Sequence, residues 1–318
     1  MRTLAMLALA VAAAAFSVAV PAQSFPSKPV RIVISFPPGG SVDFLGRTLA
    51  EKLTENFGQP VVVENRPGGF SIIAAESVAR APADGYTLLL ALDSTLTQNP
   101  GLFAKLPYDP VRDFAPVSQL TAGATFLMTH AKSGFRTLDE LIAFAKANPG
   151  KLNFAVTGVN NQLVAHQLRG VTGVSIVEVP YKGTAPMMQA LVAGEVHLVA
   201  DSPSTYSQHF GPGRLLPIAS MASRRLLFNT PTVRELGFPQ LEFNTWLGLF
   251  APGATPQPVI ARLNAEVVKV NDNADFKERL TKFGIIAATS TPEQLGAMLR
   301  EDIARWTPII KAAGLKLD

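Results

Sequence analysis

The chain has 318 residues, no cysteine and a formal net charge of +4 at pH 7. Without cysteine it has no disulfide framework, no thiolate metal site and no cysteine nucleophile. The weak basic excess forms no basic cluster with interleaved aromatic residues, so the composition indicates no nucleic-acid partner. Because 47% of the residues are hydrophobic, the chain can bury a large core, and its length suits one large or two medium-sized domains.

The N-terminus has the pattern of a secretory signal peptide. A short positive region, Met1-Arg2, precedes the apolar, Ala-rich run 4–20, and Val20-Pro21-Ala22 offers small residues to a signal peptidase. We expect cleavage after Ala22, which removes residues 1–22. The alternative is an uncleaved membrane anchor, which an Ala-rich run that ends in proline disfavours.

The first part of the mature chain alternates between strands and helices. Buried strands are predicted at 30–35, 60–64 and 86–91, and the segments between them carry apolar residues near helical spacing. This order is typical of a doubly wound α/β lobe with a parallel sheet, in which ligands bind at the carboxyl ends of the strands. Three turns are expected to converge at that edge, namely 36–43, 65–71 and 92–98.

The first of these turns has the sequence Phe36-Pro37-Pro38-Gly39-Gly40-Ser41-Val42-Asp43. Its glycines allow the backbone to turn tightly and to approach a ligand, and the helix that follows presents N–H groups at the positive end of its dipole. The N-terminus of this helix is therefore suited to bind an anion. Ser41 or Asp43 can cap the helix. A capped turn without a ligand is the alternative, because Gly-rich turns are common connections in α/β proteins.

A second series of strands and helices, from about residue 125 to 211, predicts a second α/β lobe. Its turns at 157–161, 181–184 and 201–204 are also polar. The chain then returns through an extended apolar segment at 243–250. We expect the helices after this segment to pack back on the first lobe.

Sequence motifs of enzymes are missing. The four histidines have no metal-ligand spacing, and the Gly-x-Ser-x-Gly, Walker and dinucleotide-binding patterns are absent. We therefore expect no catalytic residue, no metal and no cofactor. Polar turns at helix N-termini in two lobes favour the binding of a small polar or anionic ligand in a cleft between the lobes.

An ordered set of short motifs covers nearly the whole mature chain. In the first part of the chain it comprises Pro-Pro-Gly-Gly-x-x-Asp at 37–43, Val-Glu-Asn-Arg-Pro-Gly-Gly at 63–69, Asp-Gly-Tyr-Thr-Leu at 84–88 and Tyr-Asp-Pro at 108–110. Further on it comprises Asn-Pro-Gly-Lys-Leu at 148–152, Val-Pro-Tyr-Lys-Gly at 179–183, Pro-Thr-Val-x-Glu at 231–235, Trp-Leu-Gly-Leu-Phe-Ala-Pro at 246–252 and Ala-Gly-Leu-Lys-Leu at 313–317. With this set the sequence resembles the periplasmic substrate-binding receptors of tripartite tricarboxylate transporters, also called Bug receptors. One departure is the turn at 158, which lacks the usual Gly-x-Gly-Ser and a nearby His and has the shorter sequence Gly158-Val159-Asn160-Asn161-Gln162.

The resemblance implies a periplasmic binding protein of type II, or Venus flytrap, made of two doubly wound lobes around a central cleft. Lobe 1 is expected at 23–122 and 246–318, and lobe 2 at 123–245. The implied function is capture of a small organic acid or zwitterionic solute in the periplasm and its delivery to membrane permease subunits. We expect a monomer. The alternative function is that of a ligand-sensing receptor for a two-component sensor kinase.

The resemblance also places ligand-binding residues in the turns of both lobes, at Phe36, Pro38, Gly39, Ser41, Asp43, Asp93, Ser94, Thr95, Thr157, Asn160, Asn161, Thr184 and Asp201. Asp43 either caps the first helix or orders the first turn around the ligand. Asp93 stands where a small neutral residue is expected. If it lines the cleft, it disfavours a second carboxylate, so that a monoacid or zwitterion is expected rather than citrate; otherwise it points away or caps the following turn.

Overall fold

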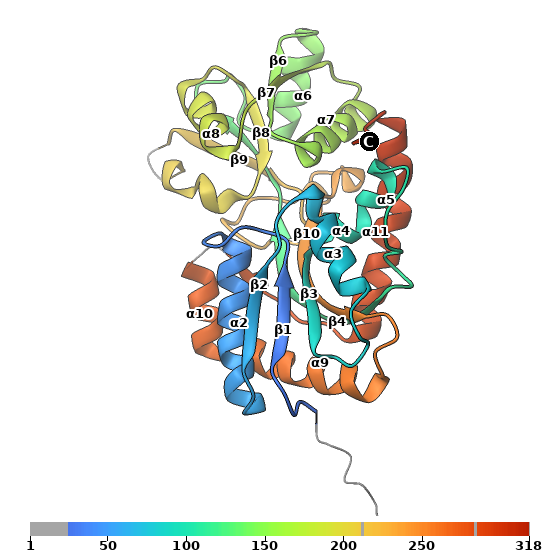
Figure 1. Ribbon diagram of the computed structural model, residues 1–318. Coiled ribbons are helices and arrows are strands. Elements are labelled where there is room, and N and C mark those ends of the chain that lie inside the picture. Colours follow the sequence, from blue (N-terminus) through green and yellow to red (C-terminus); the bar gives the residue numbers. More distant parts are fainter. Residues whose placement is uncertain (1–24, 211–212, 283–284, 318) are drawn as a thin grey trace, which may run out of the picture.

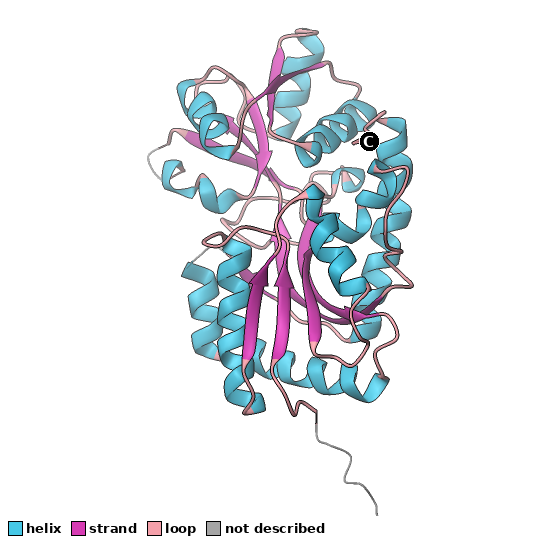
Figure 2. Ribbon diagram, in the orientation of Figure 1, coloured by secondary structure: helices cyan, strands magenta, loops and turns pink. Residues whose placement is uncertain are grey.

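The chain folds into two α/β lobes, which lie one above the other in the computed structural model (Figure 1 and Figure 2). The structure describes residues 25–317 except 211–212 and 283–284. The predicted signal peptide, residues 1–22, lies outside the described residues. Within the described part of the chain, no helix combines the length and the apolar character that crossing a membrane requires.

Lobe 1 is built on a six-stranded sheet in the order β11-β4-β10-β3-β1-β2. Its strands are β1 (Val30–Ile34), β2 (Val61–Asn65), β3 (Thr87–Leu92), β4 (Phe114–Ala124), β10 (Asn244–Pro252) and β11 (Ile286–Ala287). β1, β2 and β3 run parallel, as predicted, but β10 is antiparallel to β3 and β4 is antiparallel to β10. The predicted parallel arrangement is therefore confirmed for β1, β2 and β3, but the sheet as a whole is mixed, because β10 enters from the other lobe in the opposite direction.

Helices cover both faces of this sheet (Figure 1). One face carries α2 (Ser41–Phe57), α9 (Gln257–Asp272) and α10 (Ala274–Lys282), and the other carries α3 (Ile72–Ala79), α4 (Asp93–Thr97) and the first part of α11 (Pro292–Ala312). The apolar run of β3 explains this layering. Leu88 and Leu90 join the core under α2, whereas Leu89 and Ala91 join the core under α3, because successive side chains of a strand point to opposite faces.

Lobe 2 is built on a five-stranded sheet in the order β7-β6-β8-β5-β9. Its strands are β5 (Phe126–His130), β6 (Leu152–Val156), β7 (Ile176–Pro180), β8 (Leu198–Asp201) and β9 (Leu215–Ser220), and its helices are α6 (Leu138–Ala147), α7 (Val159–Thr172) and α8 (Thr184–Ala193). β6 runs parallel to β7 and β8, and β5 is antiparallel to both of its neighbours. This sheet is also mixed. Short 3₁₀ turns, among them η2 (Pro203–Thr205), follow β8.

Two strands of the first sheet connect the lobes. β4 continues through Thr125 into β5 of lobe 2, and the chain returns through Phe243 into β10. The connections lie side by side, since Ala124 pairs with Asn244 and Gly123 pairs with Thr245. The predicted lobe limits, 122/123 and 245/246, lie within these two strands. We keep these limits as the definition of lobe 1 and lobe 2.

The last helix spans both lobes. Leu295 and Leu299 of α11 pack in the core of lobe 1, whereas Trp306 and Ile310 pack in the main core of lobe 2. Trp306 lies against Phe243 with a ring-centroid distance of 4.7 Å. The prediction that the last helices pack on lobe 1 alone is therefore wrong for the end of α11. A helix of 21 residues is about 31 Å long, so α11 extends past lobe 1 and reaches lobe 2.

Candidate functional site

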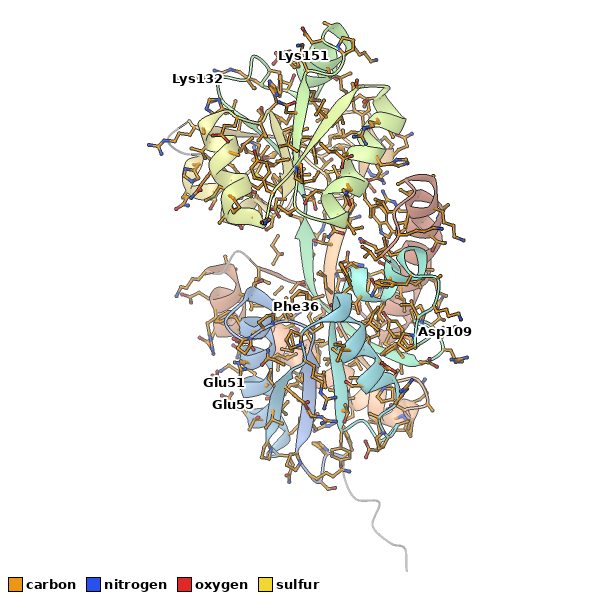
Figure 3. All side chains as sticks on the ribbon, turned by 45° about the horizontal axis from the view of Figure 1, so that its top comes forward. Phe36, Glu51, Glu55, Asp109, Lys132 and Lys151 are labelled. Atoms are coloured by element: carbon orange, nitrogen blue, oxygen red, sulfur yellow. The ribbon has the colours of Figure 1, made fainter. Side chains whose placement is uncertain are left out.

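A cleft separates the two lobes where the strands of both sheets end. It consists of three adjoining cavities of about 330, 750 and 320 Å³, and Leu92 at the end of β3 lines all three. We call them together the interlobe cleft. Lobe 1 contributes the first turn, and Figure 3 shows Phe36 at the edge of lobe 1 that faces lobe 2. Lobe 2 contributes the turns after β6 and β8.

The first turn leads from β1 into α2 and borders the largest cavity. Because α2 begins at Ser41, the N–H groups of Ser41, Val42 and Asp43 have no acceptor within the helix. The predicted cap is not formed, since no side chain accepts a hydrogen bond from this end of α2, and the N-cap residue is Gly40. The N-terminus of α2 is therefore available to an anion in the cleft.

Asp43 fixes the conformation of this turn through three polar partners. Its carboxylate accepts the backbone N–H of Gly39 at 3.0 Å, pairs with Arg47 at 3.0 Å and accepts the amide of Asn65 at 2.9 Å. The same amide donates to the carbonyl of Phe36, so Asn65 joins the second turn to the first. Chiefly through the hydrogen bond from Arg47, the pKa of Asp43 falls to about 2. Asp43 therefore stays ionised and holds the backbone, while its own side chain does not line the cleft.

Asp93 does not face the cleft, so the reading in which it selects against a second carboxylate is wrong. Its side chain is 1% exposed and accepts the backbone N–H groups of Ser94 and Trp246. Burial, with a smaller contribution from the nearby Asp302, raises the pKa of Asp93 to about 8. Thr95 is also buried and lines none of the three cavities. Of the turn at 92–98, Leu92, Ser94 and Gln98 line the cleft.

The turn after β6 forms one part of the lobe 2 wall. The amide oxygen of Asn161 accepts the backbone N–H of Thr157 at 3.0 Å and its hydroxyl at 2.8 Å, and the amide nitrogen donates to the carbonyl of Ala200 at 2.6 Å. Asn161 therefore ties this turn to the end of β8. Asn160, its neighbour, is half-buried and also lines the cleft.

Asp201 ends β8 and lines two of the three cavities. Its carboxylate accepts the N–H of Ser202 at 2.7 Å and the hydroxyl of Tyr206 at 3.1 Å, and Thr184 donates a further side-chain hydrogen bond. Burial raises the pKa of Asp201, although these three donors act in the opposite direction. The side chain is thus held in one orientation at the wall opposite the first turn.

Most of the predicted site residues come together at this cleft. Those that line it are Phe36, Pro38, Ser41, Ser94, Thr157, Asn160, Asn161, Thr184 and Asp201. Those that do not are Gly39, Asp43, Asp93 and Thr95. Gly39 and Asp43 lie in the first turn, where they support its shape.

The sequence reading missed the residues that the connecting strands contribute. The floor of the cleft includes Ala122, Gly123, Thr245 and Ile286, from β4, β10 and β11. They are small or apolar and belong to no polar turn, so no local signal marks them. Phe70 lines one cavity of the cleft and is 59% exposed; the Gly68-Gly69 pair before it is the sequence feature that could have drawn attention to it.

The three cavities of the cleft are nearly free of charge, whereas a neighbouring cavity of about 440 Å³, which shares Ala122, Gly123 and Thr245 with them, is lined by Arg224, Glu301 and Asp302. Among the described residues that line the three cavities of the cleft there is no lysine, arginine or histidine, and Asp201 is the single charged side chain. The described residues also hold no group of three potential metal ligands. What the cleft offers instead is hydroxyl, amide and backbone N–H groups from both lobes. This arrangement can hold a small anion by neutral donors.

Comparison with known proteins shows the same architecture. Residues 45–315 match the model of the tripartite tricarboxylate transporter family receptor. Protein BugT from Bordetella pertussis is 33% identical over 99% of this chain and 98% of its own length.

Two solved structures of the same kind contain a bound carboxylate. Rpa4515 from R. palustris, solved with adipate, is 32% identical with a TM-score of 0.75 and covers 92% of this chain and 100% of its own. MatC from Rhodopseudomonas palustris, with bound malate, is 32% identical with a TM-score of 0.71 and covers 90% of this chain and 100% of its own. The chain therefore belongs to the receptor family of tripartite tricarboxylate transporters, which are periplasmic solute-binding proteins.

Proposed function

We propose that this protein is a periplasmic receptor that captures a small carboxylate-bearing solute between its lobes and delivers it to the membrane permease of a tripartite tricarboxylate-type transporter. The observation that carries the proposal is the interlobe cleft itself. The uncapped N-terminus of α2 faces a cavity of about 750 Å³ whose opposite wall belongs to lobe 2. The carboxylate ligands of Rpa4515 and MatC support the same solute class.

The carboxylate is expected at the first turn. There Ser41 and Val42, at the N-terminus of α2, line the largest cavity, and the turn is already fixed by Asp43. A binding site that is ordered before the ligand arrives loses little entropy on binding. Closure of lobe 2 over the solute then excludes water and strengthens the hydrogen bonds of the solute.

Capture is tested on the mature chain, residues 23–318, after unfolding and refolding to remove any carried-over ligand. A thermal-shift screen of mono- and dicarboxylates, amino acids and aromatic acids is the first measurement. A ligand that binds the native state alone stabilises it by about 2.7 kcal/mol at a hundredfold excess over its dissociation constant. A rise in melting temperature with carboxylates, and none with the corresponding amides or esters, supports the proposal; no rise with any carboxylate contradicts it.

Delivery requires a separate experiment. Vesicles that contain the permease subunits are supplied with radiolabelled solute, with and without the receptor. Uptake that depends on the receptor supports a role in transport. Receptor-dependent activation of a sensor kinase, without uptake, identifies the signalling alternative instead.

A further inference from the structure

Asp201 is an unusual residue for a cleft that binds acids. It is the single charged side chain among the described residues of the cleft lining, and it is an anion. The largest cavity is lined by the first turn on one side and by Asp201, Ser202 and Thr184 on the other. A solute with its carboxylate at the first turn therefore directs its opposite end toward Asp201.

The contacts of Asp201 fix its orientation without neutralising its charge. The N–H of Ser202, the hydroxyl of Tyr206 and the side chain of Thr184 donate to it, but no cationic group does so in the described structure. An ionised carboxylate has about four acceptor sites on its two oxygens. Three donors leave acceptor capacity on a residue that lines the cavity.

From this placement we infer that Asp201 is a specificity-determining residue, which selects solutes with an ammonium group at the end opposite the carboxylate that the first turn holds. An ammonium group supplies the missing counter-charge and a charge-assisted hydrogen bond. A second carboxylate at the same place meets a like charge at close range in a site of low dielectric constant, and is disfavoured. The inference deepens the proposed function and rests on it.

The test compares solutes that differ at one end and have the same chain length. The probes are 4-aminobutyrate, 5-aminovalerate and 6-aminohexanoate, each against the dicarboxylate of equal length: succinate, glutarate and adipate. Dissociation constants are measured by isothermal titration calorimetry on the refolded mature chain at neutral pH. We expect the wild-type protein to bind the best amino acid of the series at least tenfold more tightly than the dicarboxylate of the same length.

The variant Asp201→Asn tests the residue itself. The asparagine side-chain oxygen still accepts the N–H of Ser202, but the charge is lost. We expect weaker binding of the amino acid, tighter binding of the dicarboxylate, and a change of at least tenfold in the ratio of their affinities. A purely structural role of Asp201 in holding the turn after β8 lowers both affinities together and leaves the ratio unchanged. Asp139→Asn, at an exposed carboxylate of α6 in the same lobe, is the matched control and should leave both affinities unchanged.

The outcomes separate this inference from the proposed function. If the wild-type protein binds the dicarboxylates as tightly as the amino acids, or if Asp201→Asn leaves the ratio unchanged, the inference is wrong while the carboxylate receptor stands. If neither the probes nor any other carboxylate binds, the proposed function fails and the inference falls with it. The wild-type comparison alone decides the first point, so the test does not depend on the folding of the variant.

Discussion

The carboxylate of Asp43 accepts the backbone N–H of Gly39 at 3.0 Å and so closes the first turn onto the helix that follows it. Gly39 has a φ of 91°, which is accessible to glycine and strained for other residues. This hydrogen bond fixes the backbone just before the N-terminus of α2, where the N–H groups of Ser41 and Val42 have no acceptor within the helix. An acidic residue thus prepares an anion site by ordering its backbone, while its own charge is paired with Arg47.

Replacement of Asp43 by alanine should disturb both stability and binding. Asp43→Ala removes the bonds to Gly39, Arg47 and Asn65 together, and we expect it to lower the free energy of unfolding by about 1–3 kcal/mol. The affinity for a carboxylate solute should fall at least tenfold, because the turn is no longer held in its binding conformation. Urea unfolding and calorimetric titration measure the two effects.

Arg47→Ala is the matched control for this variant. It removes the ion pair, whose arginine side chain is 53% exposed, and leaves the bond between Asp43 and Gly39 in place. A half-exposed pair contributes about 0.2–1 kcal/mol, and we expect the carboxylate affinity to change less than twofold. Equal losses of affinity in the two variants would show that the charge pair, and not the fixed turn, matters for binding.

The depressed pKa of Asp43 predicts a loss of stability in acid. The pKa of the carboxyl is about 2 in the folded chain, against an ordinary value of 3.8. Its contribution is therefore present above about pH 4 and is lost as the pH falls toward about pH 2, and its size is about 1–2 kcal/mol after allowance for the exposed partner. The stability difference between wild type and Asp43→Asn should shrink over this window. A difference that stays constant from about pH 6 to pH 2 would contradict the ionised role of Asp43.

Asp93 should show the opposite dependence on pH. Burial raises its pKa to about 8, so its folded form favours the protonated state. The stability associated with Asp93 is complete below its unfolded pKa of 3.8 and decreases as the pH rises toward about 8. Asp93→Asn needs no proton, and we expect it to become increasingly more stable than wild type between about pH 4 and pH 9 in thermal unfolding.

Two observations make the prediction on Asp93 specific. Asp139→Asn, at an exposed carboxylate, should show no stability gain that grows with pH. In addition, Asp93→Asn should leave the order of affinities for the solutes unchanged, because Asp93 lines none of the three cavities of the cleft. A shift in solute preference in this variant would place Asp93 in contact with the ligand and overturn our assignment.

Gly123 lies where the two connecting strands approach each other most closely. A Cβ at this position would meet the side-chain oxygen of Thr245 at 2.1 Å and its backbone oxygen at 3.1 Å. We expect Gly123→Ala to lower the free energy of unfolding by about 1–3 kcal/mol, as overpacking does in other cores. Because Gly123 and Thr245 form part of the cleft floor, the affinity for solute should fall as well.

Gly170→Ala provides the matched control in α7. A Cβ there has nothing within 4 Å, and the glycine has no positive φ. Alanine is favoured over glycine within a helix by about 0.5–1 kcal/mol, so this variant should be more stable than wild type. In urea unfolding under the same conditions, the free energy of unfolding should be lower than wild type for Gly123→Ala and higher than wild type for Gly170→Ala. A gain in stability for both variants would contradict the close approach at Gly123.

The sequence alone determined most of the strands and longer helices and the main walls of the cleft, but not α4, α5 (Asn99–Leu102), α10 or β11. Runs such as 88–91 are apolar at every position, which is typical of a strand covered on both faces, and the turns at 36–43 and 157–161 follow predicted strands directly. Local patterning is enough for these features, because burial of a strand and the start of a helix depend on neighbouring residues. The motif set predicted the family, and the match of residues 45–315 to the family model confirms this prediction.

Only the tertiary structure decided which side of each element meets the ligand. Asp93 and Ser94 are adjacent in sequence, but they begin a helix in which neighbours are rotated by about 100°, so Ser94 faces the cleft and Asp93 faces β10 and α11. The direction of β10, the floor at Gly123 and Thr245, and the reach of α11 into lobe 2 all depend on segments more than a hundred residues apart. Hydrophobic periodicity reports that a face is buried; the partner that buries it is set by the packing of the whole chain.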